Sequence, residues 1–412
     1  MADISERFYL GRQPILDRKQ EIVGYELLFR SAGRDFAEFE SYSHASASVI
    51  TNALSAFGIQ EVLGGKFGFI NVHLGLLLSE MLELLPTGQS VLELLEVIRL
   101  DQEVVERCRE LKRLGFTLAL DDHEFSPEDV EIYSIVDIVK IDILQTDTQR
   151  LPEIISQLRR WPLRILAEKV ETVEQFEACY RMGFDLFQGY FFERPVVLDK
   201  KRIDVSGMAM LKLLQQLAAD ANIDEIEQTF KENPSLSYNL LRLVNSVAFG
   251  TYEKIKTLRH AITMLGIDHI RRWIQLSLFA GNDSRGLNNP LLEMAAVRGR
   301  LMEILITREA GRPVPGEEPE TAFMTGILSL LDVLFETPMS TIIDSLNLTD
   351  EVNGALLSRQ GRLGGLLTLA ERLEVTDFDV VAPLLEQLGI TLDQLLAAQL
   401  EAFNWRNGVM QR

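Results

Sequence analysis

The chain has 412 residues, of which 47% are hydrophobic and 25% are charged, and its formal net charge is −20 at pH 7. This length allows two or three domains with substantial cores, and the composition is that of an ordinary globular protein. The strong negative charge argues against a DNA or RNA polymer as partner, because binding a phosphate backbone requires a basic face. It leaves open a small phosphate ligand that is held through metal ions.

No segment approaches the roughly 20 uninterrupted apolar residues that cross a bilayer, so we expect no membrane insertion. The N-terminus has no basic stretch followed by an apolar core, and the sequence therefore shows no signal peptide. Cys108 and Cys179 are far apart and lie on predicted helices. We interpret them as reduced core thiols of a cytoplasmic protein.

Residues 8 to about 195 alternate between short apolar runs and amphipathic helical patterns. The runs predict strands at 21–29, 66–72, 90–94, 116–120, 137–141, 163–167 and 184–187. Between them, residues 101–114 have their apolar side chains on one helical face and are followed by Gly115, a typical helix-ending residue. Thr172 and Gln175 form a capping-box start for another helix. Repeated strand–helix units predict a parallel sheet, and closure into a barrel is the expected form.

After residue 195 the strand pattern ends and helical periodicity takes over. We predict a barrel domain at 1–197, a polar linker at 198–205 and a helical domain at 206–412. The core of the helical domain is expected at about 206–285, followed by a C-terminal helical extension. The predicted fold class is thus an α/β TIM-like barrel followed by an all-α domain.

Polar residues stand at or just beyond the ends of the predicted strands. Alone, the pair Asp121-Asp122 would more simply be the start of a solvated loop. Seven consecutive strands that end in this way predict a shared site, because the carboxyl ends of parallel strands meet at one rim of a barrel. The residues are Glu26, Asn71, Glu93 with Glu96 beyond it, Asp121, Asp122, Lys140, Glu168 and Gln188.

Carboxylates and a carboxamide are hard oxygen ligands of the kind that Mg²⁺ and Mn²⁺ prefer. The five His residues show no metal-binding spacing and the cysteines form no pair, which argues against zinc. Two metal ions about 4 Å apart, bridged by an Asp, would activate a water for in-line attack on a phosphodiester. In such a site Lys140 adds a cation near the developing charge, and Glu168 serves as a base or a ligand.

Residues 8–197 resemble the EAL domain, which hydrolyses cyclic di-GMP to its linear dinucleotide on a TIM-like barrel with two divalent metal ions. The motifs that carry the resemblance are Gln13-Pro-Ile15, Tyr25-Glu-Leu-Leu-Phe-Arg30, Phe69-Ile-Asn-Val72, Glu93-Leu-Leu-Glu96, Asp121-Asp122, Lys140-Ile-Asp142, Ala167-Glu-Lys-Val-Glu171 and Gln188-Gly189. The resemblance implies Mg²⁺ or Mn²⁺ bound by Glu26, Asn71, Glu93, Asp121 and Asp122. It implies catalytic roles for Lys140, Glu168 and Asp122, and substrate contacts from Gln13, Arg30 and Gln188. It also implies that Glu96 and Glu171 support the loops of the site.

The chain departs from the EAL motifs at residues beside these ligands. The motif that names the family reads Glu-Leu-Leu, and Leu95 replaces a Thr. His123-Glu-Phe-Ser126 replaces Phe-Gly-x-Gly, which removes glycines that give a loop access to positive φ. Lys169 replaces a Gly, and its ammonium could compete with a metal ion. Loss of such supporting residues commonly lowers metal affinity or activity by about 10–100-fold.

Residues 206 to about 400 resemble the HDOD domain, a helical module related to metal-dependent HD phosphohydrolases but lacking their metal ligands. The resemblance rests on the segments 233–237, 243–250 and 255–266. Where an HD enzyme carries His-Asp, this chain has Ser329 and Leu330, which cannot ligate a metal in that way. The resemblance implies a non-catalytic domain that contacts a signalling protein of unknown identity, and a homodimer is compatible with it.

Three functions remain open at this level. The first is a metal-dependent cyclic di-GMP phosphodiesterase, with activity weakened by the altered support around its ligands. The second is an inactive EAL domain that acts as a cyclic di-GMP receptor or a protein scaffold. The third is a purely structural role, in which the acids at the rim are a relic.

Overall fold

The computed structural model describes residues 8–31, 62–190, 205–219, 222–233, 236–237, 240, 258–281, 290–308, 318–335, 337–344, 346 and 348–410. By their contacts the residues of the chain group into two compact units. Unit 1 comprises Met1–Arg194 and Leu369–Arg412, and unit 2 comprises Pro195–Thr368.

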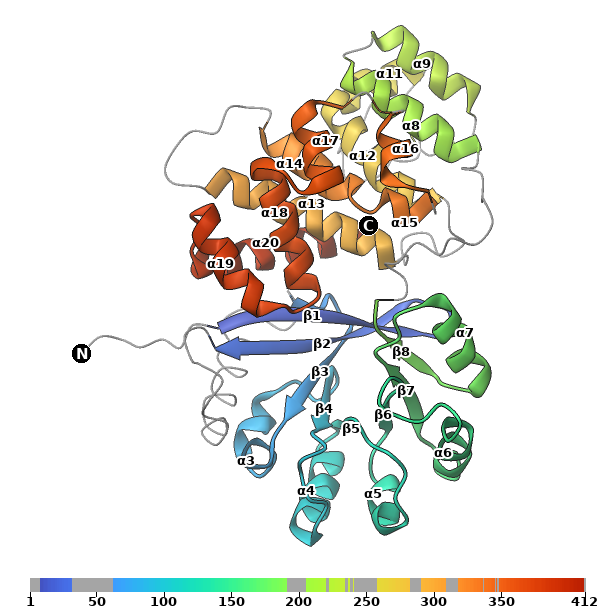
Figure 1. Cartoon of the computed structure of the whole chain (residues 1–412), viewed down its shortest axis with the longest axis vertical. Coiled ribbons are helices and arrows are strands. Elements are labelled where there is room, and N and C mark those ends of the chain that lie inside the picture. The colour runs from blue at the N-terminus through green and yellow to red at the C-terminus, as the bar shows by residue number, and fades with distance from the viewer. Residues whose placement is uncertain are drawn as a thin grey trace, which may run out of the picture. The chain divides into compact units, whose positions relative to one another are not determined.

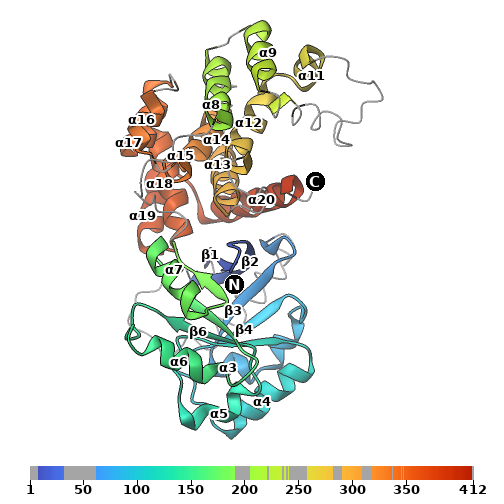
Figure 2. The ribbon, with the colours of Figure 1, turned by 90° about the vertical axis from the view of Figure 1, so that its right-hand side faces the viewer.

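Unit 1 contains a closed eight-stranded barrel with helices around its outside, as Figures 1 and 2 show from two directions. This confirms the predicted barrel. The strands are β1 (Phe8–Asp17), β2 (Ile22–Ser31), β3 (Phe67–Val72), β4 (Ser90–Leu94), β5 (Thr117–Leu120), β6 (Ile138–Asp142), β7 (Arg164–Glu168) and β8 (Leu186–Gln188). The helices between them are α3 (Leu74–Leu77), η2 (Glu80–Leu84), α4 (Gln102–Arg113), η3 (Pro127–Asp129), α5 (Val130–Tyr133), α6 (Leu151–Leu158) and α7 (Val173–Met182).

Strand β1 is the barrel element that the sequence analysis missed. It pairs antiparallel with both β2 and β8, whereas β2 to β8 are parallel to one another, as predicted. Its sequence shows no regular alternation, since Gly11 and Pro14 interrupt it and its register with β2 shifts between Ile15 and Leu16. Glycine weakens a strand and proline donates no ladder hydrogen bond, so this segment gives little strand signal.

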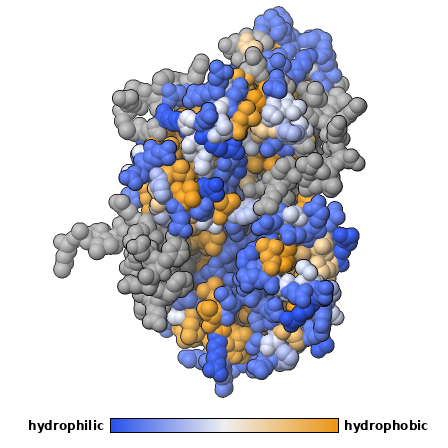
Figure 3. Space-filling model, viewed as in Figure 1, coloured by the Kyte–Doolittle hydropathy of each residue, from blue (hydrophilic) through white to orange (hydrophobic). Residues whose placement is uncertain are grey.

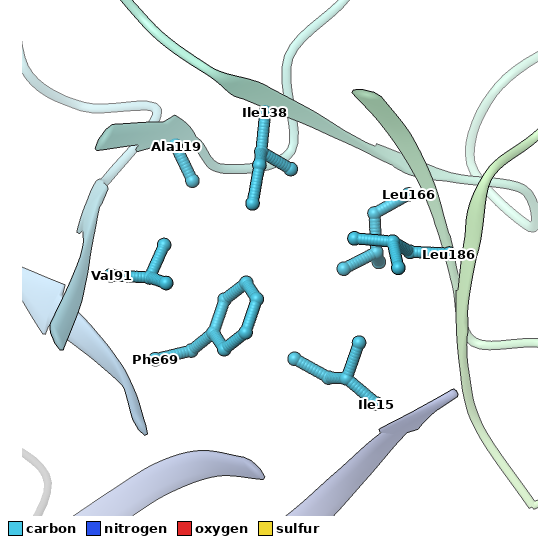
Figure 4. Close-up of a cluster of buried hydrophobic side chains, with 7 residues drawn as sticks. All are labelled: Ile15, Phe69, Val91, Ala119, Ile138, Leu166 and Leu186. Atoms are coloured by element: carbon cyan, nitrogen blue, oxygen red, sulfur yellow. The ribbon is translucent and has the colours of Figure 1, made fainter. Parts of the chain in front are cut away.

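An apolar layer fills the barrel interior. Seven buried side chains form it, and Figure 4 shows them converging from their strands: Ile15, Phe69, Val91, Ala119, Ile138, Leu166 and Leu186. On β2, Val23 packs against this cluster. Gly24 lies beside the ring of Phe69, because a Cβ on Gly24 would be 2.8 Å from Phe69 Cε2. The layer thus combines large and small residues, as the interior of a small barrel requires.

The C-terminal residues 369–412 group with the barrel rather than with unit 2. They include α19 (Phe378–Leu388) and α20 (Leu392–Met410). On β1, Gln399 Nε2 donates to Leu10 O at 3.1 Å, and the rings of Tyr9 and Phe378 stack with their centroids 5.6 Å apart. The sequence analysis placed the whole of 206–412 in one helical domain, and its domain boundaries stay a prediction.

Every regular element in the described part of unit 2 is a helix, in agreement with the predicted all-α half. The helices are α8 (Val205–Ala218), α9 (Ile223–Glu232), α11 (Leu258–Leu265), α12 (Ile267–Gly281), α13 (Pro290–Arg308), α14 (Glu318–Leu328), α15 (Leu331–Phe335), α16 (Met339–Asp344) and α17 (Asp350–Ser358), and α18 (Gly361–Glu374) continues into unit 1. Residues 243–250, one of the segments behind the resemblance, and residues 198–204 of the predicted linker lie outside the described residues.

Both cysteines are buried and free, as predicted. Burial raises the pKa of Cys108 to about 12 and that of Cys179 to about 11, so both thiols are protonated and unreactive at neutral pH. Among the described residues, no single helix has the length and apolar composition to cross a membrane. Two consecutive helical segments, Phe378–Leu388 and Leu392–Asn407, together reach this length and apolar composition, but the chain bends by 106° between them.

Hydrophilic residues cover much of the coloured part of the face shown in Figure 3. On this face, apolar residues gather in separate patches between hydrophilic ones. Single exposed apolar side chains such as Leu84 and Val97, which are 70% and 78% exposed, are ordinary in globular proteins.

Candidate active site

A polar layer lies next to the apolar layer, two residues further along each parallel strand. Side chains two residues apart point to the same side of a strand, so the residue that follows an apolar-layer residue by two also faces the barrel interior. Strand β1 runs in the opposite direction, and there the polar residue comes two positions before Ile15. The polar layer consists of Gln13, Glu26, Asn71, Glu93, Asp121, Lys140, Glu168 and Gln188.

Lys140 is at the centre of this layer and is 1% exposed. Its Nζ donates to Asp121 Oδ1 at 2.6 Å, and it forms ion pairs of 2.8 Å with Glu93 Oε1 and with Glu168 Oε1. Glu26 Oε2 lies 3.8 Å away. Burial lowers the pKa of Lys140, but these four carboxylates outweigh burial and raise the pKa well above its usual value. One ammonium therefore stays charged among four carboxyl groups.

Burial dominates the pKa values of three of these carboxyl groups. It raises the pKa of Glu93 well above the ordinary range and also raises the pKa of Asp121, although Lys140 acts in the opposite direction on both. Burial raises the pKa of Glu168 to about 8, again against the attraction of Lys140. The layer thus holds more negative charge than one lysine neutralises, and either protons or a further cation must compensate for it.

Glu26 is held by side-chain amides. Asn71 Nδ2 donates to Glu26 Oε1 at 2.8 Å, and Gln188 Nε2 donates to Glu26 Oε2 at 2.6 Å. Gln188 Nε2 also donates to Gln13 Oε1 at 2.9 Å, and Gln13 in turn donates to the Tyr190 hydroxyl. Burial raises the pKa of Glu26, but Lys140 and the two amide donors outweigh it and leave this pKa lowered. Glu26 is therefore the carboxylate of this layer that stays ionised most readily.

Several buried oxygen atoms in this region accept no hydrogen bond. They are Asn71 Oδ1, Glu93 Oε2, Glu168 Oε2 and Asp122 Oδ1, whereas Glu93 Oε1 is paired with Lys140 at 2.8 Å. A buried acceptor without a donor costs about 1–3 kcal/mol, and more when it is charged. Such a set of hard oxygens fits Mg²⁺ or Mn²⁺. In the described part of the chain, no three acidic, imidazole or thiol side chains form a ready-made metal cage, and a bound ion would share these carboxylates with Lys140.

A second group of charges lies at the rim of the barrel. Lys169 Nζ donates to Asp142 Oδ2 and lies 4.0 Å from Asp122 Oδ2. Asp142 is 4% exposed, and its Oδ1 accepts hydrogen bonds from two backbone N–H groups of the following turn. Burial raises the pKa of Asp142, but these hydrogen bonds outweigh it and hold the pKa below its usual value. Asp142 had no predicted role, although its place at the end of β6, two residues after Lys140, was a usable signal.

The loop 123–126 does not need the glycines that it lacks. None of its four residues has a positive φ, whereas Asp122 before it has φ 43°. The hydroxyl of Tyr133 holds the loop, since it accepts a hydrogen bond of 2.8 Å from Ser126 N and lies 2.8 Å from His123 Nε2. The structure thus supplies a replacement for the altered motif through a tyrosine that the sequence analysis did not single out.

The structure brings most of the predicted site residues together, and Arg30, Glu96 and Glu171 are not among those with a described side-chain contact in this layer. Arg30 is on β2, but its side chain lies outside the described residues. Glu96 is exposed after β4, and the backbone N–H of Glu171 donates to Gln175 Oε1 at 2.8 Å. The functional roles of all these residues stay predictions.

Comparison with known proteins identifies a domain family in each half of the chain. The model of the EAL domain matches residues 74–195, and the model of the HDOD domain matches residues 207–335. The uncharacterized protein YuxH of Bacillus subtilis is 31% identical over 412 residues, covering 98% of this chain and 99% of its own. The cyclic di-GMP phosphodiesterase CdgJ of Vibrio cholerae is 30% identical over 405 residues, covering 97% of this chain and 93% of its own.

Solved structures are also similar to part of the chain. The EAL domain protein from Listeria monocytogenes EGD-e is 23% identical, with a TM-score of 0.36, and the match covers 46% of this chain and 88% of that one.

Proposed function

This chain belongs to the family of proteins that combine an EAL domain with an HDOD domain, and we propose that its barrel hydrolyses cyclic di-GMP to the linear dinucleotide with Mg²⁺ or Mn²⁺. The observation that carries the proposal is the layer of four carboxylates around the buried Lys140, in which some oxygens accept no hydrogen bond. A relative aligned over nearly the whole chain is named a cyclic di-GMP phosphodiesterase, which supports the same substrate here.

The residues that would hold a divalent ion are Glu26, Asn71, Glu93 and Asp121, with Asp122 next to them at the rim. When bound, such an ion supplies charge that polarises a phosphodiester and lowers the pKa of a water molecule. Asn71 turns its amide nitrogen to Glu26 at 2.8 Å, which leaves its oxygen available as a ligand.

The chain's own groups supply the remaining chemistry. Lys140 stays protonated and provides a fixed positive charge for the phosphate. Glu168 has a pKa of about 8, close to neutral pH, which suits a group that takes up and returns a proton. Gln13 and Gln188 hydrogen-bond to each other before any substrate binds, so their positions are fixed in advance.

The test is to incubate the purified full chain with cyclic di-GMP and either Mg²⁺ or Mn²⁺ and to separate the products by chromatography. We expect linear dinucleotide from the wild type and a loss of at least about 100-fold in Glu93→Gln, which removes a buried carboxylate from the layer. Glu103→Gln is the matched control, because Glu103 is exposed on α4, and it should keep the wild-type rate.

Absence of product with both metals would overturn the proposed hydrolysis. Calorimetric titration with cyclic di-GMP then separates the remaining functions. Binding without turnover is the result expected of a receptor, and absence of binding is the result expected of a structural relic.

For the helical half we propose a non-catalytic role as the part that contacts another signalling protein. Ser329 and Leu330, which stand where HD enzymes carry His-Asp, are 5% and 4% exposed. Arg298 Nη1 donates to Ser329 Oγ at 2.7 Å, and this hydroxyl donates to Gly326 O at 2.7 Å. The position is therefore part of a packed helical core, which supports a role without metal chemistry.

A further inference from the structure

Lys169 has an unusual backbone conformation. It follows Glu168 at the end of β7, and its φ is 55°, in the left-handed region. Side chains other than glycine rarely adopt this region, and a long side chain persists there only when its surroundings hold it in place. Glycine adopts this conformation freely, so the backbone at this position could form without a lysine side chain.

The contacts of Lys169 explain what its side chain does there. Its Nζ donates to the buried Asp142 and lies 4.0 Å from Asp122 Oδ2, while Asp122 Oδ1 is buried and accepts no hydrogen bond. Like any ordinary lysine at neutral pH, Lys169 carries a charged ammonium, and this ammonium lies against the rim carboxylates.

The two lysines divide the carboxylates of the barrel mouth between them. Lys140 contacts the four inner carboxylates, and Lys169 contacts the two at the rim. At the inner group, the single positive charge of Lys140 is shared among four carboxylates, which leaves negative charge to bind a divalent ion. The Nζ of Lys169 lies 4.0 Å from Asp122 Oδ2, so a second divalent ion on Asp122 would be repelled by this ammonium.

We propose that the ammonium of Lys169 takes the place of the second divalent ion, so that the barrel binds one Mg²⁺ or Mn²⁺ per chain, on the inner group. The inference rests on the proposed phosphodiesterase site and concerns its metal content. As a fixed monocation, Lys169 can neutralise Asp122 and hold a phosphate oxygen by a hydrogen bond. It cannot lower the pKa of a water molecule as a divalent ion does, so that chemistry belongs to the inner ion.

The test counts Mn²⁺ ions on the full-length protein without using turnover. Calorimetry and equilibrium dialysis give the stoichiometry, and electron paramagnetic resonance reports exchange coupling, which arises only when two Mn²⁺ ions lie close together. The second readout is needed because a chain with a net charge of −20 also binds Mn²⁺ weakly on its surface. We expect one tightly bound, uncoupled ion in the wild type.

Lys169→Gly should gain a second ion, bound at least about tenfold more tightly than any second ion of the wild type, and a coupled spectrum. Glycine relieves the positive φ, which offsets part of the stability lost with the contact to Asp142. Lys169→Gln removes the charge without changing the side-chain length much and should also gain the second ion. Lys19→Gln is the matched control, because Lys19 is exposed in the turn between β1 and β2, and it should bind one ion.

Two coupled ions in the wild type would overturn the inference while leaving the proposed hydrolysis intact. One ion in both Lys169 variants would overturn it in the same way, because the ammonium would then not be the reason for the missing ion. No tightly bound ion in any of the proteins would instead refute the metal site of the proposed function, and the inference with it.

Discussion

Glu168→Gln tests whether excess buried negative charge shapes the stability of the barrel. In the protein without metal, burial raises the pKa of Glu168 from an ordinary value of 4.5 to about 8. The folded state therefore holds a proton between these two pH values, whereas the unfolded chain has released it. A group of this kind makes stability fall as the pH rises, and glutamine in its place does not titrate.

The size of the effect follows from the two pKa values. Each pH unit between them changes the free energy of unfolding by about 1.4 kcal/mol. Between pH 5.5 and 7.5 the contribution of Glu168 should fall by about 2.5 kcal/mol, slightly less than two full units because the upper pH approaches the folded pKa. The wild type should therefore lose about 2.5 kcal/mol more than Glu168→Gln over this range.

The assay is urea unfolding of both proteins at pH 5.5 and 7.5 with a chelator present. The two units can unfold separately, so the signal must come from the barrel alone. The fluorescence of Trp161 should provide it once the other two tryptophans are replaced by phenylalanine, because the ring centroids of Trp161 and Tyr133 in the barrel are 5.1 Å apart. Glu103→Gln, on the exposed face of α4, controls for the loss of one carboxylate. Equal pH dependence in the wild type and Glu168→Gln would refute the reasoning.

Three further substitutions probe the packing around the site. Lys140→Met leaves four carboxylates, three of them buried, without their cation and should lower the free energy of unfolding by about 3–5 kcal/mol at pH 7.5 without metal. The exposed Lys19→Met should change the stability little, and equal stability of the two variants would contradict the role of the buried ammonium. Tyr133→Phe removes the hydroxyl that holds the loop 123–126 and should cost about 1–2 kcal/mol, with faster hydrogen exchange confined to this loop. Gly11→Ala places a Cβ 2.5 Å from Thr376 Cγ2, so it should destabilise the barrel by about 1–3 kcal/mol in a thermal melt. Thr376 has a positive φ of 56°, so Thr376→Gly should stabilise the wild type too, but it should stabilise Gly11→Ala more. Equal effects in the two backgrounds would mean that the clash lies elsewhere.

Much of the candidate site could be predicted because a strand has a local period of two. An apolar residue such as Ile138 and a polar residue such as Lys140 necessarily point to the same side of β6, whatever the rest of the chain does. The same spacing recurs along the parallel strands, so the sequence alone indicated that carboxylates, an amide and a lysine share one rim.

Strand β1 shows where this local reasoning stops. Its glycine and proline conceal the period, and its antiparallel direction follows only from closure between β2 and β8. The resemblance to the EAL motifs assigned Gln13 a substrate contact, but its contact with Gln188 depends on that closure. Likewise, no local pattern indicates that residues near Phe378 pack against Tyr9, because a contact between the two ends of a chain has no signature in either segment.

The sequence by itself determined which residues line the mouth of the barrel, because strand periodicity and motif order are local properties. The tertiary structure decided how their charges are shared. It places Lys140 among four acids, three of them buried, and it brings the ammonium of Lys169 to Asp122 and Asp142. Burial and distance set the pKa values and cation sites, and both quantities exist only once strands that are distant in sequence have closed into a barrel.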